Sequence, residues 1–544
     1  MEVIIILLYI LPTLILFSYS CAQLNLVWNY WRSRRLAVGN RQSAVSGWQS
    51  AVGNQLTGQS VLNRPAGKSN QQSADGNSEL KTQTARAASL IPTTPYPILA
   101  TEDSRLKTTR PFVTIQLPIY NERYVIERLI AAVVAFDYPR TLFEIQILDD
   151  STDETVEIVA AKVAFYQAQG FQIQHIRRTD RVGFKAGALA YGLTLAKGEF
   201  VAIFDADFVP TPDFLQKTIH HFADPKVGVV QTRWGHLNET YSLITQLQAF
   251  GLDGHFIVEQ GGRNAGGHFI NFNGTAGIWR KSCIADAGGW EADTLTEDLD
   301  LSYRAQMRGW RFVYLEDVET PAELPATMPA LKSQQYRWMK GAAECARKNL
   351  FNVFKRKEIK LSTKIHAAFH LLNSGVFIAV LLMALVSVPT LIVTHQFPQF
   401  NYLLGIFRAF QLSVLMLLGF YWTAHYRRKT LIEMAWQLPL FLTVIMGLSL
   451  HNSVAVLEGY MGKKTPFVRT PKWGIVQNKD AWQQKNYLVK SLNPLTVVEI
   501  LLAIYFAFGI GLGLYWHSYQ MLLLHTLLTL GYGFVGFYSV KHSM

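Results

Sequence analysis

Residues 200–207 read FVAIFDAD, five apolar residues followed by two aspartates that flank one alanine. A short, continuous apolar run of this kind is typical of a strand buried on both faces of a sheet. Residues 112–118 and 144–148 predict two further strands. Helical patterns separate these strands, so residues 110–320 are predicted to form an α/β domain with helices on the faces of a sheet.

Polar side chains follow each predicted strand: Tyr120 and Glu122 after the first, Asp149 and Asp150 after the second, Asp205 and Asp207 after the third. In open α/β sheets, ligands bind at the carboxyl ends of the strands. The sequence therefore predicts a ligand site at that edge of the sheet. It contains no G-x-G-x-x-G segment and no Walker loop, which argues against a dinucleotide site or a phosphate-loop site.

The chemistry of Asp205 and Asp207 suits a hard divalent cation, because such ions prefer carboxylate and phosphate oxygens. Lys185, in the segment GFKAG, would place an ammonium group within reach of a phosphate. Taken alone, each feature has a simpler explanation, as a pair of turn-forming aspartates or a solvated lysine at a helix start. Their combination favours a bound diphosphate.

Two later motifs add to this pattern. Thr296-Glu297-Asp298 precedes a predicted helix at 299–308, where negative charge at a helix start would be favourable in any protein. Gln334-Gln-Tyr-Arg337-Trp338 lies on a predicted amphipathic helix, where arginine and tryptophan could equally anchor a membrane interface. Four such features in one order point to a single catalytic site.

The order of these motifs resembles the processive branch of glycosyltransferase family 2, which includes cellulose, hyaluronan and chitin synthases. Three other segments are similar to the plant cellulose-synthase-like mannan and glucan synthases: KAGAL at 185–189, FNGTAG at 272–277 and AGGW at 287–290. The similarity extends from about residue 111 to residue 474 and includes the order of the apolar segments.

The resemblance implies an α/β GT-A domain, a Rossmann-like transferase fold for nucleotide-diphospho-sugars, beside an α-helical transmembrane bundle. It also implies an inverting sugar transfer and a Mg²⁺ or Mn²⁺ ion held by Asp207. Asp298 matches the general base that deprotonates the acceptor hydroxyl. The other implied site residues are Pro118, Tyr120, Glu122, Asp150, Lys185 and Asp205 for the donor, Glu297, Gln334, Arg337 and Trp338 for catalysis, and Asn273 and Gly274 on the acceptor side.

Residues 467–472 read FVRTPK and resemble the gating loop of cellulose synthases, Phe-x-Val-Thr-x-Lys. The resemblance implies that Phe467, Thr470 and Lys472 fold over the bound donor. Arg469 stands where that pattern has valine. An ordinary basic loop beside the membrane is the alternative explanation for this segment.

Apolar runs at both ends of the chain predict membrane helices. Residues 1–31 predict an anchor, because they are followed by Arg32, Arg34 and Arg35 and are too long for a cleaved signal peptide. Within 366–544, four further spans are predicted, at 367–393, 403–422, 495–516 and 519–540. Residues 434–457 are predicted to lie in the interface or to re-enter, because Pro439 and a polar cluster interrupt the run.

The basic residues beside these runs predict an orientation. Lys463, Lys464, Arg469 and Lys472 would all stay inside if 434–457 does not cross the membrane. The sequence therefore predicts an integral multi-pass membrane protein whose catalytic domain and residues 458–494 are cytoplasmic. Residues 321–365, with the Q-x-x-R-W motif, are predicted to form interfacial helices between the GT-A core and the membrane region.

The amino-acid composition indicates a linker and argues against nucleic-acid binding and against a metal site made of cysteines. Residues 32–109 predict a disordered linker, since 39–88 are rich in Gly, Ser, Asn, Gln and Ala. The net charge of +12 lies largely beside apolar runs, which favours lipid contact over nucleic-acid binding. The three cysteines, Cys21, Cys283 and Cys345, are too far apart for metal-ligand spacing.

The sequence thus predicts a membrane-bound glycosyltransferase that adds sugar from UDP-glucose or GDP-mannose to a β-linked polysaccharide, a β-1,4-glucan or mannan, and translocates it. Its expected partners are a nucleotide-sugar donor, a glycan acceptor and the lipid bilayer, with no nucleic acid. One alternative is a glycolipid-forming transferase of the ceramide-glucosyltransferase kind. Another is a non-catalytic membrane transporter or scaffold with the same fold.

Overall fold

The computed structural model describes residues 1–59, 110–402, 412–465, 468–476, 480–483, 485, 487 and 493–543, with side chains from 1 to 36 and from 110 onward. The chain divides into two units, Met1–Val27 with Asp103–Met544, and Trp28–Glu102. The sheet, the candidate site and the C-terminal helices all belong to the first unit.

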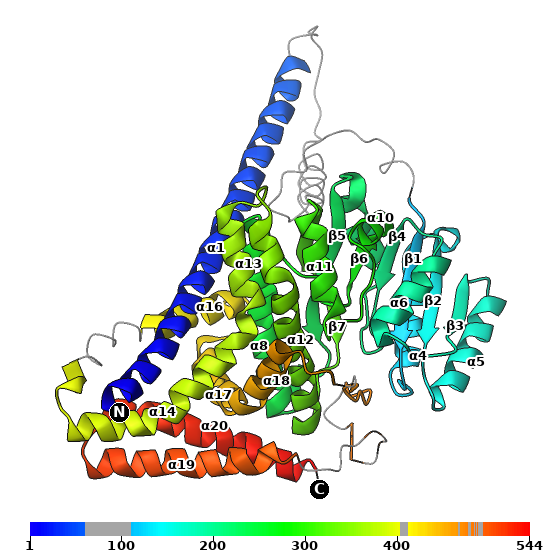
Figure 1. Cartoon of the computed structure of the whole chain (residues 1–544). Helices are drawn as coiled ribbons and strands as arrows, with labels where there is room; N and C mark the ends of the chain where they lie inside the picture. Colours follow the sequence, from blue (N-terminus) through cyan, green and yellow to red (C-terminus); the bar gives the residue numbers. More distant parts are fainter. Residues whose placement is uncertain are drawn as a thin grey trace, which may run out of the picture. The chain divides into compact units, whose positions relative to one another are not determined.

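A mixed sheet of seven strands in the order β3-β2-β1-β4-β6-β5-β7 forms the centre of the α/β domain (Figure 1). Strand β6 runs antiparallel to both of its neighbours, and the other adjacent strands are parallel. The strands are β1 (Val113–Ile119), β2 (Phe143–Asp149), β3 (Ile173–Arg177), β4 (Phe200–Ile203), β5 (Val227–His236), β6 (Gly277–Arg280) and β7 (Arg311–Ala322).

Alternate residues of the central strands face opposite sides of the sheet, as strand geometry requires. In β4, Phe200 and Ala202 belong to one buried apolar cluster, whereas Val201 and Ile203 belong to the other. The helices that pack on the first face are α4 (Ile126–Val134), α5 (Thr155–Ala168) and α7 (Phe214–Thr218). The helices on the second face are α6 (Phe184–Leu195), α10 (Lys281–Asp286) and α11 (Glu297–Met307).

The register of the parallel strands brings the predicted acidic segments together. Val113 pairs with both Phe143 and Phe200, so β1, β2 and β4 start level with one another. Their carboxyl ends therefore meet at one edge of the sheet. The three predicted strands agree with β1, β2 and β4 to within one residue at each end.

Five helical segments connect the sheet to the C-terminal region: α8 (Leu243–Asp253), the π-helix η4 (Gly254–Gln260), α9 (Gly261–Ala265), α12 (Met328–Lys355) and α13 (Leu361–Leu371). Helix α12 carries the Q-x-x-R-W motif and starts at a regular cap. The Thr327 hydroxyl accepts a hydrogen bond from the backbone N–H of Ala330, at 3.4 Å, and Pro329 lies in the first turn.

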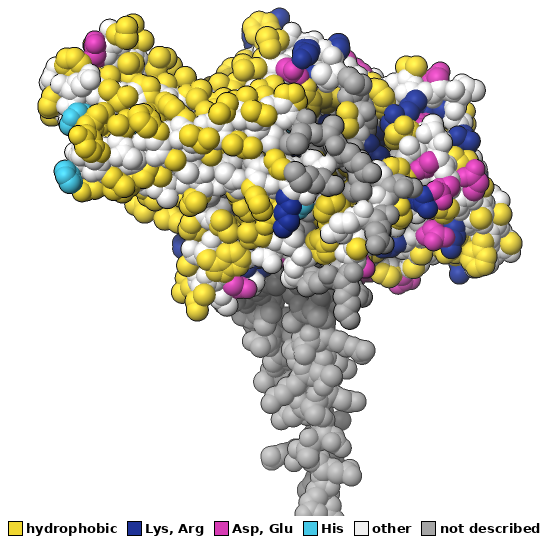
Figure 2. Space-filling model, turned by 90° about the horizontal axis from the view of Figure 1, so that it is seen from below, with side chains coloured by type: hydrophobic (Ala, Val, Ile, Leu, Met, Phe, Trp, Pro, Cys, Tyr) yellow, Lys and Arg dark blue, Asp and Glu magenta, His cyan; other side chains and the backbone are white. Residues whose placement is uncertain are grey.

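Among the described residues, four helices are long and apolar enough to cross a membrane: Glu2–Leu36, Asn373–Gln396, Leu495–Tyr515 and Tyr519–Lys541. The last three contain α14 (Val376–Gln396), α19 (Leu495–Tyr515) and α20 (Leu522–Lys541). Figure 2 shows the face that these helices form, which is covered by hydrophobic side chains, while charged side chains gather over the α/β domain. Exposed residues of α19 include Val497, Leu501, Ile504 and Phe508.

The C-terminal segments differ in detail from the sequence expectation. The run at 367–393 is divided between α13 and α14 by a short turn at Asn373–Gly375, so the candidate span starts later. Of 403–422, residues 403–411 lie outside the described part, and α16 (Leu412–His425) is an apolar helix of 14 residues.

The predicted re-entrant segment is a bent helix pair. Helices α17 (Leu431–Gly447) and α18 (Ser449–Met461) meet at an angle of 51°. Helix α17 continues through Pro439, so the expected break at that proline is wrong and the bend lies at Leu448 instead. The polar cluster Ser449, His451 and Asn452 starts α18 directly after the bend, and its side chains are buried.

The N-terminal helix α1 (Glu2–Gln59) extends further than the predicted anchor. The start of the predicted linker at residue 32 is therefore wrong for the described part, because the backbone remains helical through Gln59. Its alanines and glutamines are compatible with a helix, although they cannot form an apolar core. Residues 60–109 lie outside the described part.

Helices α17 and α20 cross at two glycines. A Cβ atom on Gly531 would lie 2.1 Å from the carbonyl oxygen of Thr443, and one on Gly447 would lie 2.2 Å from that of Gly531. Such close backbone contact is open only to glycine, and small residues at helix crossings allow it in membranes. By contrast, a Cβ on Gly533 would meet no atom within 4 Å.

We expect opposite effects from alanine at these two positions of α20. Gly531→Ala should destabilise the protein by about 1–3 kcal/mol, because the added methyl overpacks the crossing. Gly533→Ala should stabilise it by up to about 1 kcal/mol, since alanine favours the helix. Thermal unfolding in detergent measures both. Equal shifts in one direction would rule out a tight contact at the crossing.

Candidate functional site

A cleft at the carboxyl edge of the sheet collects the residues that the motifs predict. Of the residues predicted for this cleft, Phe467 lies outside the described part of the chain. The others line it together: Pro118, Tyr120, Glu122, Asp150, Lys185, Asp205, Asp207, Asn273, Gly274, Glu297, Asp298, Gln334, Arg337, Trp338, Thr470 and Lys472. Segments that lie up to about 350 positions apart along the chain therefore form one site.

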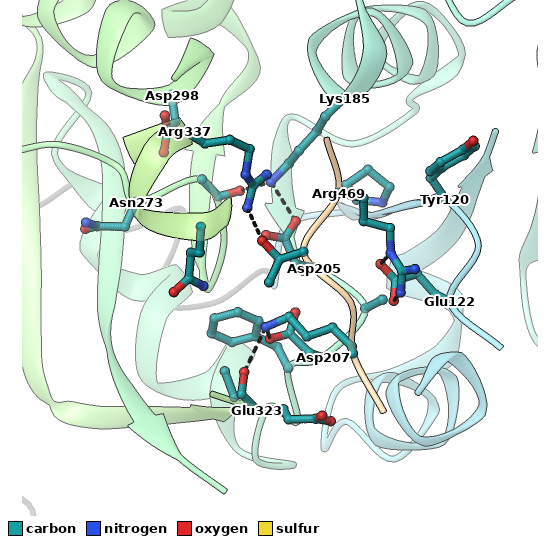
Figure 3. A pocket seen from close by; sticks show the side chains of 18 of the residues that line it. Tyr120, Glu122, Lys185, Asp205, Asp207, Asn273, Asp298, Glu323, Arg337 and Arg469 are labelled. Atoms are coloured by element: carbon teal, nitrogen blue, oxygen red, sulfur yellow. Dashed lines mark hydrogen bonds and ion pairs between the residues drawn. The ribbon is translucent and has the colours of Figure 1, made fainter. Parts of the chain in front are cut away.

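Asp205 follows β4 and is paired with the lysine of the GFKAG segment. The Lys185 ammonium, in the first turn of α6, donates to Asp205 Oδ1 at 2.6 Å and to the carbonyl oxygen of Gly274 at 3.0 Å (Figure 3). Burial alone would lower the pKa of Lys185, but the carboxylates of Asp205 and Glu297 raise it above its ordinary value. Lys185 is therefore held as a cation in the middle of the cleft.

Asp207 is paired with a lysine from the C-terminal segment. Lys472 Nζ donates to Asp207 Oδ2 at 2.6 Å and to the carbonyl oxygen of Glu323 at 2.8 Å. The next residue, Trp473, donates its backbone N–H to Glu323 Oε1 at 2.9 Å. These contacts fix residues 472–473 against the end of β7.

Arg469, the residue that departs from the gating-loop pattern, has a partner of its own. Its guanidinium donates two hydrogen bonds to the carboxylate of Glu122, at 2.8 and 2.6 Å. Burial raises the pKa of Glu122 to about 7, against the opposing effect of Arg469. Arg337 reaches the same segment and donates to the Thr470 hydroxyl at 3.1 Å. Residues 469–472 thus lie across the cleft, bound at both sides.

Three site residues were not indicated by the sequence patterns. Arg178 follows β3 and pairs with Asp150, with Nε donating to Oδ1 at 3.0 Å. Arg181 stacks on the Tyr120 ring, with its guanidinium carbon 3.3 Å from the ring centroid. Trp234, near the end of β5, lines the cleft beside Trp338, and their ring centroids lie 6.5 Å apart. The sequence around Arg178, which directly follows β3, carries no motif that would have indicated its pairing with Asp150.

The triplet 296–298 begins helix α11 and is fixed to α12. Leu295 donates its backbone N–H to Glu344 Oε2 at 2.8 Å, and the Cys345 thiol donates to the carbonyl oxygen of Thr296 at 3.5 Å. A Cβ on Gly341 would lie 2.5 Å from Thr296 Cγ2. Because α12 also carries Arg337 and Trp338, these contacts hold the two motifs against each other.

Glu297 and Asp298 are neighbouring, half-buried acids. Burial and the charge of Glu297 raise the pKa of Asp298 to about 7, while Lys185 opposes this shift. Burial also raises the pKa of Glu297. A carboxyl group whose pKa lies near neutral pH can accept a proton and release it again under ordinary conditions.

A second cavity continues from the cleft toward the apolar helices. Asn273, Asp298, Gln334 and Trp338 line both spaces. Beyond them the second cavity is lined mainly by apolar side chains of α8, α12, α17 and α20, among them Leu247, Leu331, Phe441, Val444 and Phe534. Asp298 therefore stands between a charged chamber and an apolar one.

Two groups of acids could be considered for a metal ion. Glu291, Asp293 and Asp300 lie close together outside the cleft, and the Lys348 ammonium donates to all three. Asp205 and Asp207 offer carboxylate oxygens at the strand end, in the cleft, where the phosphates of a ligand could supply further oxygens. The donor set of this second group fits Mg²⁺ or Mn²⁺.

The chain is similar to proteins of known family. The family model described as "Glycosyltransferase like family 2" matches residues 111–341. Glucomannan 4-beta-mannosyltransferase 1 of Oryza sativa subsp. japonica is 42% identical over 275 residues, which cover 49% of this chain and 53% of the relative. Glucomannan 4-beta-mannosyltransferase 9 of Arabidopsis thaliana is 35% identical over 396 residues, which cover 70% of this chain and 71% of the relative.

The chain spans about half the length of the first curated relatives that it matches. Among solved structures, a mannosyltransferase from Pyrobaculum calidifontis in complex with GDP-Man and Mn²⁺ is similar to it. That likeness has 19% sequence identity and a TM-score of 0.43, and it covers 66% of this chain and 95% of the other.

The pairing of Lys472 with Asp207 leads to a binding prediction. Lys472→Met should increase the affinity of the full chain for Mn²⁺ alone by about tenfold, because a hydrogen bond between charged groups is worth roughly 1.5 kcal/mol or more. Titration calorimetry of the detergent-solubilised protein measures the Mn²⁺ affinity of the variant and of the wild type. Lys463→Met, whose ammonium pairs with Glu458 outside the cleft, is the matched control. Weaker or unchanged Mn²⁺ binding by Lys472→Met would remove Asp207 from the metal site.

Proposed function

Since the chain belongs to glycosyltransferase family 2, in its cellulose-synthase-like branch, we propose that it transfers sugar from a nucleotide-sugar donor to a growing β-linked polysaccharide. The family and the GT-A fold of the α/β domain are those expected from the motifs. GDP-mannose is the donor that we favour and β-1,4-mannan the product, because the curated relatives are glucomannan 4-beta-mannosyltransferases. UDP-glucose is the competing donor.

One observation carries the proposal: Asp298 separates a charged chamber from an apolar one. The charged chamber holds Lys185, Arg337, Arg469 and Lys472, which suit the two phosphates of a donor. The apolar chamber suits a sugar chain, since the rings of Trp338 and Trp234 offer flat faces at its mouth. A donor sugar between the two would face Asp298 on one side and the cations on the other.

The proposed reaction follows from this separation. An acceptor hydroxyl enters from the apolar side and loses its proton to the Asp298 carboxylate as its oxygen attacks the anomeric carbon. The bond between that carbon and the diphosphate oxygen breaks, and negative charge develops on the leaving diphosphate. Lys185 and Arg337 stabilise that charge from the opposite side. A single displacement inverts the anomeric centre, so an α-linked donor yields a β-linked product.

Asp207, with Asp205, would hold the divalent ion, which supplies positive charge to the leaving diphosphate when bound. Lys472 must then leave Asp207 Oδ2, where it donates its hydrogen bond at 2.6 Å. Its ammonium is then available to the diphosphate. This gives residues 469–472 the gating role that the motif suggested.

The second cavity leads from the cleft toward the apolar helices. Its lining by α17 and α20 gives the product a path into the apolar helices, and we propose that the growing chain leaves the site there and is translocated. The proposed domain boundaries are those of the sequence prediction, 110–320, 321–365 and 366–544. The catalytic domain and residues 458–494 then lie on the cytoplasmic side.

Membranes that contain the full chain test the proposal with each radiolabelled donor in turn. The product should be insoluble in organic solvent and degraded by a β-1,4-mannanase. A product from UDP-glucose that cellulase degrades would replace the donor and keep the mechanism. A product that partitions into chloroform would support the glycolipid alternative, and donor binding with no product would support the non-catalytic one.

Asp298→Asn should lower the rate of sugar transfer by about 10²-fold or more, because a general base contributes 10²–10⁴-fold. The affinity for GDP with Mn²⁺ should change little, since the carboxylate does not face the nucleotide. Transfer assays with GDP-mannose and calorimetry with GDP measure the two. Transfer above about a tenth of the wild-type rate would assign the base to another residue.

The raised pKa of Asp298 predicts the pH dependence. Below about pH 7 Asp298 becomes protonated and cannot accept a proton, so kcat/KM should fall as the pH falls through this range. Glu297→Gln removes the neighbouring negative charge that raises this pKa. The acid limb of its pH–rate profile should therefore lie at lower pH than that of the wild type. An unmoved limb would mean that another group controls the acid side of the profile.

A further inference from the structure

The acceptor side of the cleft contains a chain of hydrogen bonds that the reaction above does not use. It runs through the π-helix η4, between α8 and α9, and ends at Asn273 in the FNGTAG segment. A π-helical turn is rare and is found frequently at functional sites. Here it sets His255 and Glu259, four positions apart, on the wall of the second cavity.

In this series of hydrogen bonds, the donor and acceptor of each bond follow from those of the bond before it. Gln260 Nε2 donates to the carbonyl oxygen of Asn271 at 2.7 Å and to Asn273 Oδ1 at 2.8 Å. Asn273 Nδ2 therefore points the other way and donates to His255 Nε2 at 3.0 Å. His255 Nδ1 lies 2.9 Å from Glu259 Oε2, so the proton of the neutral imidazole is on Nδ1.

Glu259 fixes this arrangement from inside the fold. Its side chain is 9% exposed, and Arg263 Nη1 lies 3.6 Å from Oε2. Burial opposes ionisation, but Arg263 and His255 hold the pKa of Glu259 below its ordinary value. The side chain of His255 is 27% exposed, so the ring is supported at Nδ1 and accessible from the cavity. A buried carboxylate thus orients a histidine that faces the acceptor side.

The two atoms at the cavity end form a matched pair. His255 Nε2 accepts and Asn273 Nδ2 donates, and their separation of 3.0 Å is similar to that of two neighbouring hydroxyl oxygens on a sugar ring. Asn273 and Asp298 line the same two cavities, and a Cβ on the neighbouring Gly274 would lie 3.0 Å from Asp298 Oδ2. Figure 3 shows Asn273 on the same side of the cleft as Asp298, away from Tyr120 and Glu122.

We propose that His255 and Asn273 form an acceptor subsite that binds two neighbouring hydroxyls of a pyranose ring, and that Glu259 is a positioning residue for it. One sugar hydroxyl donates to His255 Nε2, and its neighbour accepts from Asn273 Nδ2. Both atoms then exchange their mutual hydrogen bond for one with the sugar. The subsite rests on the proposed function and names the groups that set the acceptor in line with Asp298.

If the subsite is correct, binding of the acceptor sugar depends on His255 and binding of the nucleotide-sugar donor does not. In the full chain in membranes, with GDP-mannose and a short soluble β-1,4-manno-oligosaccharide, His255→Ala should raise the acceptor KM about tenfold, as expected for one lost hydrogen bond. The donor KM should stay the same, and more GDP should be released for each sugar transferred. His255→Gln, which keeps a hydrogen-bonding group, should recover part of the loss.

Glu259→Gln should raise the acceptor KM by less than His255→Ala, because the imidazole remains but its tautomer is no longer fixed. The matched control is His220→Ala, an exposed histidine of the short helix Ile219–Ala223, which should match the wild type. GDP binding with Mn²⁺ checks that each variant is folded. The wild-type enzyme gives a second test, since an acceptor that lacks one of the two ring hydroxyls should show a similar rise in KM.

The outcomes separate the subsite from the function on which it rests. Transfer by the wild type with an acceptor KM that His255→Ala leaves unchanged overturns the subsite alone. A fall in kcat with both KM values unchanged also overturns it, since that would mark a role in the chemical step. Absence of transfer by the wild type from either donor overturns the proposed function and the subsite with it.

Discussion

The crowding of several carboxylates, each partly or fully buried, in one cleft is the constraint on which the rest of the structure depends. Asp205 and Asp207 end one strand, and Glu122, Glu297, Asp298 and Glu323 surround them. Like charges removed from water need partners close by. The cations come from three separate places: Lys185 from α6, Arg337 from α12, and Arg469 with Lys472 from the C-terminal segment. The ion pairs and hydrogen bonds in the cleft therefore connect the sheet to α12 and to the C-terminal segment.

Much of this arrangement could be predicted from the sequence because its signals are local. An apolar run that ends on acids identifies a strand and its carboxyl end, as at 200–207. Parallel strands in register then place Asp150 and Asp205 at the same edge without further information. The motif at 334–338 was placed in the cleft by its order in the chain, and α12 carries it there.

Other features could not be predicted, because they depend on contacts between distant residues. Arg178 is an ordinary exposed-looking arginine until β3 brings it beside Asp150. His255 and Glu259 belong to no motif in the sequence, and the π-helical turn η4 sets them on the wall of the second cavity. The bend between α17 and α18 lies at Leu448 and not at Pro439, which α17 accommodates in its helix. The end of the N-terminal helix was missed because composition alone does not distinguish a polar helix from a linker.

The lysine beside Asp207 has a consequence for the order in which molecules enter the cleft. While Lys472 donates to Asp207, the charges of that carboxylate are already balanced from within. A divalent cation that bound to Asp207 without a diphosphate would displace the Lys472 ammonium and leave it without a partner. A diphosphate that bound without a cation would bring further negative charge close to the acidic side chains. A complex of the two brings balanced charge, so the lysine can turn from the acid to a phosphate at little electrostatic cost. Under the proposed function, the cleft would therefore bind the donor and the divalent ion as one complex and would release the nucleotide together with the ion.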